Sequence, residues 1–320
     1  MIPADLILFP QCQYEASRTN GNGVSQPIEP ARRSRRAIGG PKVTDNGFDL
    51  GIEVLVRERY MIGAIVGDII GSVHEGSGTK TKDFPLFTEE SCFTDDTVLT
   101  VAVAECILRS GSYVDRLHEY FHAYPQAGYG GSFIRWAGYR RREPYNSWGN
   151  GSAMRVSPVG FAYDTLDQVL HEAKASAEVT HNHPEGIRGA QATAAAVHLA
   201  LLGRERGDIK AYLESEFGYA LSDRLDDIRE SYRFDVSCQG SVPQAIIAFL
   251  ESTSYEDAIR NAISLGGDAD TMACIAGGIA EAHYGGVPEE IREAAWSRLD
   301  DRLRAVVQEF YLRYARSSAP

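Results

Sequence analysis

The residues best suited to chemistry in this chain lie in two short acidic segments that are far apart in the sequence. The first segment places Asp95 and Asp96 between two threonines, ahead of an apolar run. The second places Asp268 and Asp270 ahead of another run of small apolar residues. Aspartate and threonine offer hard oxygen ligands, which suit Mg²⁺ or Mn²⁺ and not zinc.

Both segments also predict helix starts. Thr94 precedes Asp95 and Asp96, and a threonine followed by acids and an apolar run is typical of a helix N-terminus, where negative charge is favoured. Each acid pair could therefore be no more than a stable first turn. If the two starts face each other, four carboxylates meet beside the hydroxyls of Thr94 and Thr271. Crowded carboxylates repel one another unless protons or cations neutralise them, so we predict a centre for two divalent metal ions.

Composition limits the class of protein. The chain has 320 residues, enough to bury a sizeable core in one or two domains, and its 43% hydrophobic content is ordinary for a soluble protein. The net charge of −12 argues against nucleic-acid binding as the main function. Five widely spaced cysteines without a C-x-x-C pair favour reduced thiols and a cytoplasmic location. We see no basic leader and no run long enough to cross a bilayer, so we expect no membrane contact.

The first 59 residues differ from the rest. They hold 8 Lys and Arg against 7 Asp and Glu, a net charge of +1 that leaves −13 for the remainder. Glycine and proline turn signals and a basic block at 32–36 interrupt any helical or strand period. We therefore expect 1–59 to be an extended arm. The apolar run Leu6–Phe9 near its tip could anchor on a partner.

From residue 60 to residue 320 the pattern predicts one all-α domain. Glycines at 63, 67 and 71 recur every four residues, so they share a helix face that another helix can approach closely. No alternating strand pattern of any length is present. Helical patterns follow the first acid pair as far as Ser110 and also cover 113–124, 166–179, 186–202, 242–250, 255–265 and 289–314.

Two other segments carry groups that could act on a substrate. Glu75 lies in a loop that looks mobile, where it could reach into a cleft, although most loop glutamates are only solvated surface. The passage 145–155 is rich in Gly and Asn, which permit unusual backbone angles and leave amides free to bind an anion. Trp148 or Tyr145 could stack on a base, or the passage could be a tight connection around a buried tryptophan.

The histidines near residue 181 allow a further alternative. His181 and His183, together with Glu185, resemble zinc ligands, but no fourth ligand lies at a usable spacing. We therefore interpret His181 as a cleft residue. Pro184 is expected to stop the helix that precedes it.

In combination, five motifs resemble those of the ADP-ribosylglycohydrolase family, which includes the hydrolases that release dinitrogenase reductase from ADP-ribosylation. Each motif is modest alone, but five in the right order are specific, and they span roughly residues 61–286. The resemblance implies an all-α fold with two Mg²⁺ or Mn²⁺ ions near the ADP-ribose. The motifs are Gly-Asp-x-x-Gly-Ser-x-x-Glu, Thr-Asp-Asp-Thr, Gly-Asn-Gly-Ser-Ala-Met-Arg, Thr-His and Gly-Gly-Asp-Ala-Asp-Thr.

The resemblance also implies roles for individual residues. Glu75 is implied as the gating or catalytic glutamate, and Asp95 or Asp96 are alternatives for the catalytic base. The implied metal ligands are Thr94, Asp95, Asp96, Asp268, Asp270 and Thr271. The implied contacts with ADP-ribose are Gly149, Asn150, Gly151, Ser152, Met154 and His181.

The reaction that this family implies is metal-assisted hydrolysis of a glycosidic bond, which removes ADP-ribose from a modified protein side chain. Water attacks the anomeric carbon through an oxocarbenium-like state. The linkage stays open among ADP-ribosyl-arginine, ADP-ribosyl-serine and O-acetyl-ADP-ribose. Arginine is the first choice, because an acidic body could accommodate a guanidinium group.

The arm is a departure from the family, whose typical member starts near Met61. A hydrolase with such an addition resembles the immunity proteins paired with bacterial ADP-ribosyltransferase toxins, which implies an arm that blocks the toxin. Two other classes remain open. One is a non-catalytic binding protein with a structural metal site, and the other is a metal phosphohydrolase, for which only Arg155 offers a phosphate-reading cation.

Overall fold

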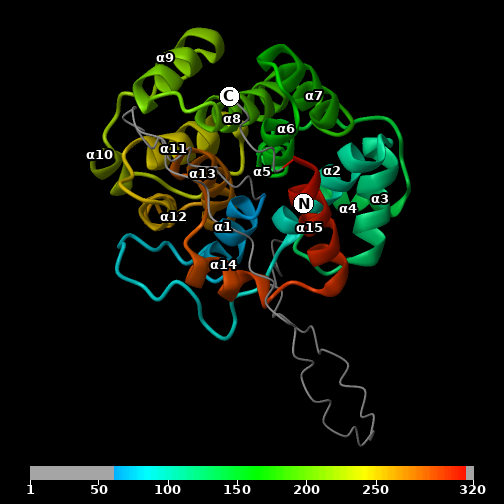
Figure 1. Ribbon diagram of the computed structural model, residues 1–320, viewed down its shortest axis with the longest axis horizontal. Coiled ribbons are helices and arrows are strands. Elements are labelled where there is room, and N and C mark those ends of the chain that lie inside the picture. The colour runs from blue at the N-terminus through cyan, green and yellow to red at the C-terminus, as the bar shows by residue number, and fades with distance from the viewer. Residues whose placement is uncertain (1–60, 315–320) are drawn as a thin grey trace, which may run out of the picture. The chain divides into compact units, whose positions relative to one another are not determined.

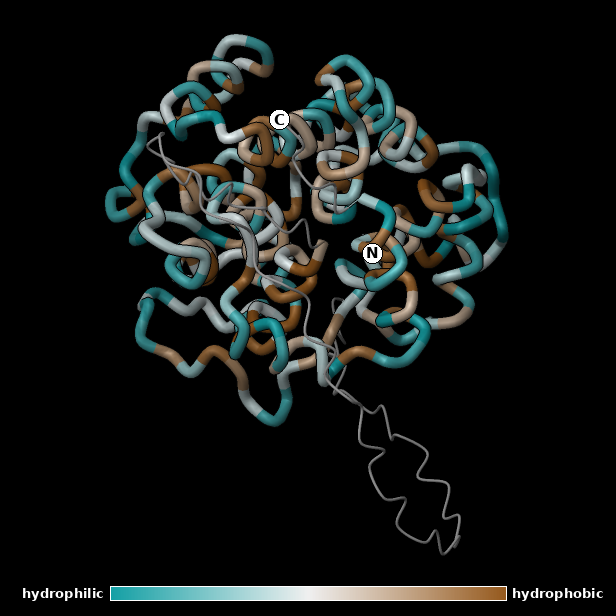
Figure 2. Tube along the Cα trace, viewed as in Figure 1, coloured by the Kyte–Doolittle hydropathy of each residue, from teal (hydrophilic) through white to brown (hydrophobic). Residues whose placement is uncertain are grey.

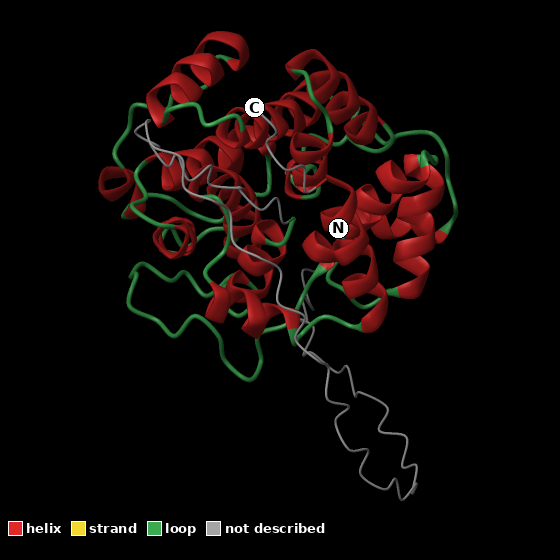
Figure 3. Cartoon of the chain, viewed as in Figure 1, coloured by secondary structure: helices red, strands yellow, loops and turns green. Residues whose placement is uncertain are grey.

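The computed structural model describes residues 61–314, and all regular secondary structure in this range is helical apart from one isolated bridge (Figure 1, Figure 3). The prediction of an all-α body is therefore confirmed for these residues. The arm predicted for residues 1–59 lies outside them and stays a prediction. None of the helices in the described range is both long enough and apolar enough to cross a membrane.

The helices in this range follow one another along the chain with short connections, except for the long segment between α1 and α2. They are Gly63–Gly71 (α1), Asp95–Arg109 (α2), Tyr113–Ala123 (α3), Gly131–Gly138 (α4), Gly151–Met154 (α5), Ser157–Ala162 (α6), Leu166–Glu178 (α7), Pro184–Leu201 (α8), Arg206–Phe217 (α9), Leu225–Arg229 (α10), Cys238–Leu250 (α11), Tyr255–Ile263 (α12), Ala269–Tyr284 (α13), Glu289–Trp296 (α14) and Asp301–Tyr314 (α15).

The pair α1 and α13 forms the centre of the core. Every residue of α1 is buried. A Cβ atom at Gly67 would lie 2.1 Å from the carbonyl oxygen of Ala273, and one at Gly71 would lie 2.4 Å from the Cα of Asp270. Only glycine fits this approach, so the predicted glycine face is confirmed. The outer chain in Figure 2 is largely hydrophilic, and hydrophobic segments recur on the inner helices.

A buried carboxylate fixes the beginning of α1. The backbone amide of Gly63 donates to Glu281 of α13 at 2.7 Å, and the amide of Ile62 donates to the same carboxylate at 3.3 Å. These amides have no partner inside their own helix. Burial raises the pKa of Glu281 to about 8, although the two amide donors lower it. The register between α1 and α13 is thus set at both ends of α1.

Most predicted helices are present, and two predictions need correction. Pro184 does not merely stop a helix. It opens α8, because a proline at the first helical position lacks only an N–H that would have no partner anyway. The predicted stretch 289–314 is two helices, since α14 ends at Trp296 and α15 begins at Asp301. Five helices were not predicted from the sequence and lie between the predicted ones, namely α4, α5, α6, α9 and α10.

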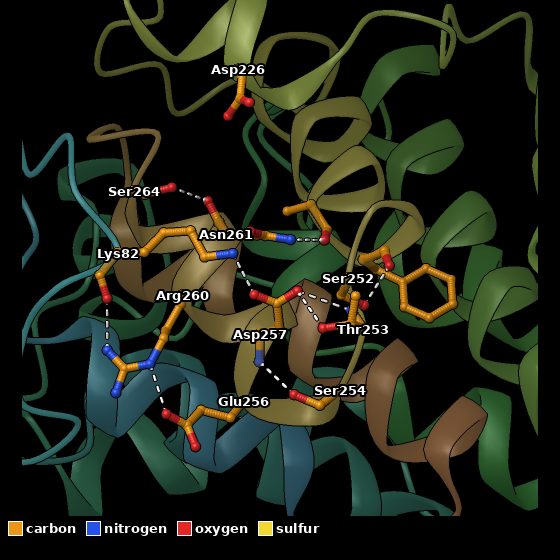
Figure 4. A network of polar contacts seen from close by, with 12 residues as sticks. Lys82, Asp226, Ser252, Thr253, Ser254, Glu256, Asp257, Arg260, Asn261 and Ser264 are labelled. Atoms are coloured by element: carbon orange, nitrogen blue, oxygen red, sulfur yellow. Dashed lines mark hydrogen bonds and ion pairs between the residues drawn. The ribbon is translucent and has the colours of Figure 1, made fainter.

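The segment after α1 is tied down by side chains, against the predicted mobility of this loop. The amino group of Lys80 donates to the carbonyl oxygens of Arg229 and Tyr232, both at 2.7 Å, and to that of Leu265. Further along, Lys82 pairs with Asp257 of α12. Figure 4 shows this pair within the polar network around α12, in which Arg260 donates to the Lys82 carbonyl at 2.8 Å.

The cysteines depart in part from the expectation of five reduced thiols. Cys106, Cys238 and Cys274 are free and buried. Cys92 is disulfide-bonded, so the expectation is wrong for this residue.

Candidate active site

The two acidic segments face each other, as the sequence predicted. They begin α2 and α13, and the turn after α1 adds Glu75. Carboxylate oxygens of Glu75, Asp268 and Asp270 lie within 4.8 Å of one another. The hydroxyl of Thr271 donates to Asp96 at 3.3 Å across 175 positions of sequence. The N-termini of α2 and α13 therefore converge, and both helix dipoles favour negative charge there.

The start of α2 is held by a carboxylate that the sequence reading gave no role. Asp68 of α1 accepts hydrogen bonds from the amides of Thr94 (2.9 Å) and Thr97 (3.0 Å) and from the Thr97 hydroxyl. Its other oxygen accepts from the Thr94 hydroxyl at 2.6 Å. The Thr94 oxygen also accepts from the Asp96 amide at 3.3 Å, as a helix cap does. Its hydrogen is thus committed to Asp68, and a lone pair stays free for a cation.

The start of α13 is held differently. Asp268 is the N-cap residue, but its side chain makes no capping hydrogen bond. Instead its carboxylate accepts from the side-chain amide of Asn150 at 2.8 Å, and the same amide donates to Ser241 at 3.1 Å. Asp270 accepts from the backbone amide of Thr271 at 2.8 Å. Asp268 therefore faces the site and does not cap its own helix, whereas Asp270 also accepts from a first-turn amide of α13.

The crowding of carboxylates raises their pKa values. Burial and the charge of Asp270 raise the pKa of Asp68 to about 7, and burial, Asp270 and Asp68 raise that of Glu75 to about 7. Burial followed by Asp270 raises the pKa of Asp268 well above its usual range. The pKa values of Asp95 and Asp96 are raised well above theirs for the same two reasons. Such a set is stable near neutral pH only with protons or cations among its members.

The residues fit hard divalent cations. Asp96 is only 2% exposed, and one of its carboxylate oxygens, Oδ2, is buried without a hydrogen-bond partner. A buried carboxylate oxygen without a donor is costly unless a cation meets it. The donors here are carboxylates and hydroxyls, the set preferred by Mg²⁺ and Mn²⁺. Within 61–314 no other group of three acidic, histidine or cysteine side chains comes so close together.

Asp95 differs from its neighbour Asp96. Its backbone amide donates to the carbonyl oxygen of Ala127 at 2.7 Å, which brings the loop before α4 to the site. One of its carboxylate oxygens lies 3.5 Å from the position that a Cβ at Gly128 would take. Gly128 has φ of +104°, a backbone angle that other residues rarely adopt. Asp95 thus lies at the rim of the acidic cluster.

The predicted substrate-binding passage lies beside these acids and forms the short helix α5. Gly149 pairs with Ser237, and the sulfur of Met154 lies 3.9 Å from the Thr271 hydroxyl. The hydroxyl of Ser152 donates to the carbonyl oxygen of Gly186 at 2.7 Å and is fully buried. Ser152 therefore fastens α5 to α8, and its hydroxyl is not available to a substrate.

His181 lies over the same passage. A Cβ at Gly151 would be 3.2 Å from its Nε2 atom, which is tighter than an ordinary contact. The ring of Tyr145 is 5.9 Å from that of His181. His183 is not part of the group of clustered ligand side chains found in residues 61–314, and its Nδ1 atom accepts from the amide of Glu185 at the start of α8. The interpretation of His181 as a cleft residue stays consistent with this placement.

Two residues weighed in the sequence reading lie elsewhere than expected. Trp148 is 53% exposed, so the passage is not a connection around a buried tryptophan. Arg155 is fully buried and donates to the Ser176 carbonyl and the Thr180 hydroxyl. Its guanidinium is therefore not exposed to the phosphate of a substrate. This removes the one cation that supported the phosphohydrolase alternative.

Sequence reasoning missed Asp68 and Thr180 as members of the site. Asp68 lies in the Gly-Asp motif, one residue after Gly67 and three before Gly71. A carboxylate on an otherwise apolar, glycine-spaced helix was the signal that could have found it, because an isolated buried acid needs partners. Thr180 lies in the Thr-His motif and carried no such signal.

Comparison with known proteins agrees with this geometry. Residues 56–319 match the family described as ADP-ribosylglycohydrolase. The chain belongs to this family. The resemblance seen in the five motifs is thereby confirmed, and the family reaches beyond them on both sides.

Curated relatives share a modest part of the sequence. ADP-ribosylhydrolase ARH3 of Mus musculus is 30% identical over an alignment covering 73% of this chain and 85% of that protein. The protein named ADP-ribosylarginine hydrolase Tri1 of Pseudomonas putida is 25% identical, with 78% and 76% covered. A solved structure titled ADP-ribosylglycohydrolase-related protein complex matches with a TM-score of 0.59 and 24% identity, covering 81% of this chain and 99% of that one. This last likeness concerns the fold.

Proposed function

We propose that this ADP-ribosylglycohydrolase-family protein is a metal-dependent hydrolase that removes ADP-ribose from modified protein side chains, with arginine as the linkage. The observation that carries the proposal is the meeting of two helix starts and Glu75 in one acidic cluster, with a buried Asp96 oxygen that lacks a donor. The residues that would hold the cations are Thr94, Asp95, Asp96, Asp268, Asp270 and Thr271.

The proposed cofactor is a pair of Mg²⁺ or Mn²⁺ ions. When bound, such cations neutralise crowded carboxylates, polarise oxygen ligands and lower the pKa of water. The chain's own part is to hold the ligands without rearrangement. Asp68 fixes Thr94, and Asn150 fixes Asp268. Outer hydrogen bonds of this kind orient metal ligands and tune their basicity.

Glu75 is the proposed general base. It lies on the turn after α1 and is only partly buried, unlike Asp96 and Asp268. It lies close to Asp268 and Asp270, and its carboxylate accepts no hydrogen bond from another residue in the range 61–314. Glu75 can therefore take a proton from the attacking water, whose oxygen then bonds to the anomeric carbon as the glycosidic bond breaks. The leaving side chain departs on the opposite side of the sugar carbon.

The passage from Gly149 to Met154 and His181 would bind the ADP-ribose part. This passage is next to the acids, because Asn150 contacts Asp268. The turn before α5 gives an anion close access to backbone. His181 lies over Gly151.

Arginine is proposed as the released side chain on two grounds. The positively charged guanidinium of an arginine side chain is attracted to a site that has several carboxylates and no basic residue among its proposed ligands. The Pseudomonas relative bears the name of an ADP-ribosylarginine hydrolase. Serine is the alternative linkage, which would keep the metal site and the reaction.

The decisive experiment measures release of ADP-ribose from arginine-modified and serine-modified protein, with Mg²⁺ and then with EDTA. Asp268→Ala/Asp270→Ala should abolish release. A matched control is Asp226→Ala/Asp227→Ala, which removes two exposed acids of α10 that are not among the proposed ligands. Release from serine alone would correct the linkage. No release from either substrate would reject the hydrolase and favour a non-catalytic binding protein.

Glu75→Gln tests the base separately. We expect turnover at saturating substrate to fall by about 100–10,000-fold, the usual contribution of general acid–base catalysis. Binding of Mn²⁺ should persist. Full turnover in this variant would remove Glu75 from the mechanism and leave Asp95 as the next candidate.

An immunity role against an ADP-ribosyltransferase toxin is proposed from the sequence of residues 1–59 alone. The arm would bind the toxin while the helical body reverses the modification. Deletion of 1–59 should abolish binding of the toxin and leave hydrolysis intact. Loss of both together would contradict this division of labour.

A further inference from the structure

A chain of hydrogen bonds leads from a buried arginine to the histidine over the proposed substrate passage. Arg155 is fully buried, and its NH2 group donates to the Ser176 carbonyl at 3.0 Å and to the Thr180 hydroxyl at 2.8 Å. Thr180 Oγ1 lies 2.7 Å from Nδ1 of His181. All three side chains are buried, since Thr180 is 0% and His181 5% exposed.

The positions of the hydrogens follow from which groups can donate. A guanidinium only donates, so Thr180 Oγ1 is the acceptor in its bond with Arg155. The threonine has one hydrogen of its own to give. Among the described residues, His181 Nδ1 is the acceptor that makes an ordinary hydrogen bond with it. If Thr180 donates, Nδ1 carries no hydrogen, and a neutral ring then has its hydrogen on Nε2.

The competing arrangement reverses these roles. His181 Nδ1–H would donate to Thr180, and the threonine hydrogen would have to turn towards Tyr145, which lies nearby. The side chains of Thr180 and Tyr145 are hydrogen-bonded to each other. In the competing arrangement Tyr145 would accept from Thr180, and the tyrosine hydrogen would find no acceptor among the described residues. In the first arrangement Tyr145 donates to Thr180, so each hydrogen of this group has an acceptor. The first arrangement therefore satisfies more of the buried polar groups, which is the usual rule in proteins.

The other ring nitrogen faces the proposed site. Nε2 of His181 has no hydrogen-bond partner among residues 61–314, yet it is not among the atoms that are both buried and unpartnered. It lies close to the space over Gly151 and Gly149, at 3.2 Å and 3.7 Å from the Cβ positions of these glycines. A hydrogen on Nε2 thus points to a place that a ligand can reach.

Burial, together with a nearby positive charge, keeps the His181 ring neutral. Burial and the charge of Arg155 lower the pKa of His181 well below its usual range. Among the residues that the structure describes, the charged and titratable groups that face the ring are Arg155 and Tyr145, and none of their carboxylates is placed against it. His181 is therefore a neutral donor at physiological pH, and it does not add a cation to the site.

We propose that Arg155 and Thr180 are positioning residues that hold His181 as a neutral imidazole with its hydrogen on Nε2, ready to donate to an oxygen of the ligand. The ligand class is an acceptor oxygen of a phosphate or of a ribose hydroxyl. This inference deepens the proposed function and rests on it for the identity of the ligand. The hydrogen-bond chain itself does not depend on that identity.

The first test reads the hydrogen directly. In ¹⁵N-labelled full-length protein, long-range ¹H–¹⁵N spectra distinguish a ring with its hydrogen on Nε2 from the other tautomer and from the imidazolium. His181→Gln identifies the signals. We expect the Nε2–H form between pH 6 and 8 in wild type, with a mixture or the other form in Thr180→Val. Nδ1–H or imidazolium in wild type would overturn the proposal, whether or not the protein is a hydrolase.

The second test measures function by binding. Calorimetry with ADP-ribose and with ADP, both in Mg²⁺, should show affinity reduced about 10-fold in Thr180→Val, as expected for one lost hydrogen bond, and restored in Thr180→Ser. An equal loss for both ligands assigns the bond to phosphate, and a loss for ADP-ribose alone assigns it to the distal ribose. Equal affinity of Thr180→Val and wild type for both ligands would reject the role.

Thr193→Val is the matched control. Thr193 is also a buried threonine, in α8, and its hydroxyl has no hydrogen-bond partner. The same substitution there removes a hydroxyl from the interior without touching the chain from Arg155 to His181. The His181 spectrum and both affinities should stay as in wild type. If Thr193→Val changes them as much as Thr180→Val does, the effect is general destabilisation and the proposal fails.

Discussion

The starts of α2 and α13 carry similar sequences and are supported in opposite ways. At α2, Asp68 from a neighbouring helix accepts hydrogen bonds from the first-turn amides, and Thr94 and Asp96 are left to face the site. At α13, no side chain caps the helix at Asp268, and a neutral amide from Asn150 orients the aspartate. The difference shows that an acidic helix start does not by itself make a metal site. Each start depends on a residue from another part of the chain.

The largest expected effect breaks the α13 start through its packing. Gly71→Ala would place a Cβ 2.4 Å from the Cα of Asp270 and 2.7 Å from its nitrogen, where backbone must move. We expect Mn²⁺ affinity to fall by about 100-fold, because a small displacement of a ligand is enough. Unfolding free energy should drop by about 1–3 kcal/mol. Titration calorimetry and denaturant unfolding measure both.

Gly207→Ala is the control for this change. Gly207 lies in the first turn of α9, and a Cβ there meets nothing within 4 Å. The same substitution should stabilise the protein slightly or leave it unchanged, since alanine favours helix by up to about 1 kcal/mol. Wild-type metal affinity in Gly71→Ala would show that the α13 start does not depend on α1.

The α2 start should be sensitive to its outer acid. Asp68→Asn leaves a single acceptor oxygen where two oxygens now receive the donors of Thr94 and Thr97. The amide nitrogen would also face a donor. We expect Mn²⁺ affinity to fall about 10–100-fold. Thr97→Val, which removes just one of the donors, should have a smaller effect, and equal effects would mean that Asp68 acts only as a helix cap.

The stability of the metal-free protein should depend on pH in an unusual direction. The pKa values of Asp68 and Glu75 rise from 3.8 and 4.5 to about 7 on folding. Folding therefore favours their protonated forms, and this stability is lost as the pH rises through about 7. We expect Tm in EDTA to fall between pH 5 and pH 8.

Added metal should cancel this fall. Mg²⁺ at about 100 times its Kd should add about 2.7 kcal/mol, which raises Tm by about 5–10 °C for a domain of this size. Differential scanning calorimetry with and without Mg²⁺ at each pH checks both statements. A Tm in EDTA that is highest at pH 8 would contradict the crowding of carboxylates.

The smallest effect concerns the neutral support of the α13 start. Asn150→Ala removes the donor to Asp268 and leaves the metal ligands in place. We expect about a 10-fold loss of Mn²⁺ affinity. Ser241→Ala removes the other partner of the same amide and is the matched comparison. It should bind Mn²⁺ almost as wild type does, and a loss equal to that of Asn150→Ala would assign the effect to the position of the amide.

Local signals gave the fold and the acids of the site. Glycines every four residues predicted the α1 surface, and a threonine before two acids predicted the α2 start. These features follow from local propensity. The support from Asp68 and Asn150 could not be read in this way, because it joins residues that are 26 and 118 positions apart. The same holds for the hydrogen bonds of Lys80, because its carbonyl acceptors at Arg229 and Tyr232 are 149 and 152 positions away in the sequence.

The break between α14 and α15 and the start of α8 at Pro184 show another limit. Both depend on how a helix end is satisfied, and a helical period alone does not encode it. The arm at residues 1–59 and its proposed role stay predictions from the sequence, because these residues lie outside the range that the structure describes.

The pairing of α1 with α13 has a consequence for how the protein is made. Gly63 and the carboxylate that caps it, Glu281, are 218 residues apart. At ordinary rates of translation, roughly 10–40 s separate the synthesis of the two. For that interval α1 lacks the helix against which its glycine face packs, and the acids of α2 lack those of α13. The nascent protein must therefore wait on the ribosome with its central helix uncovered, and chaperones that bind apolar segments would find α1 first.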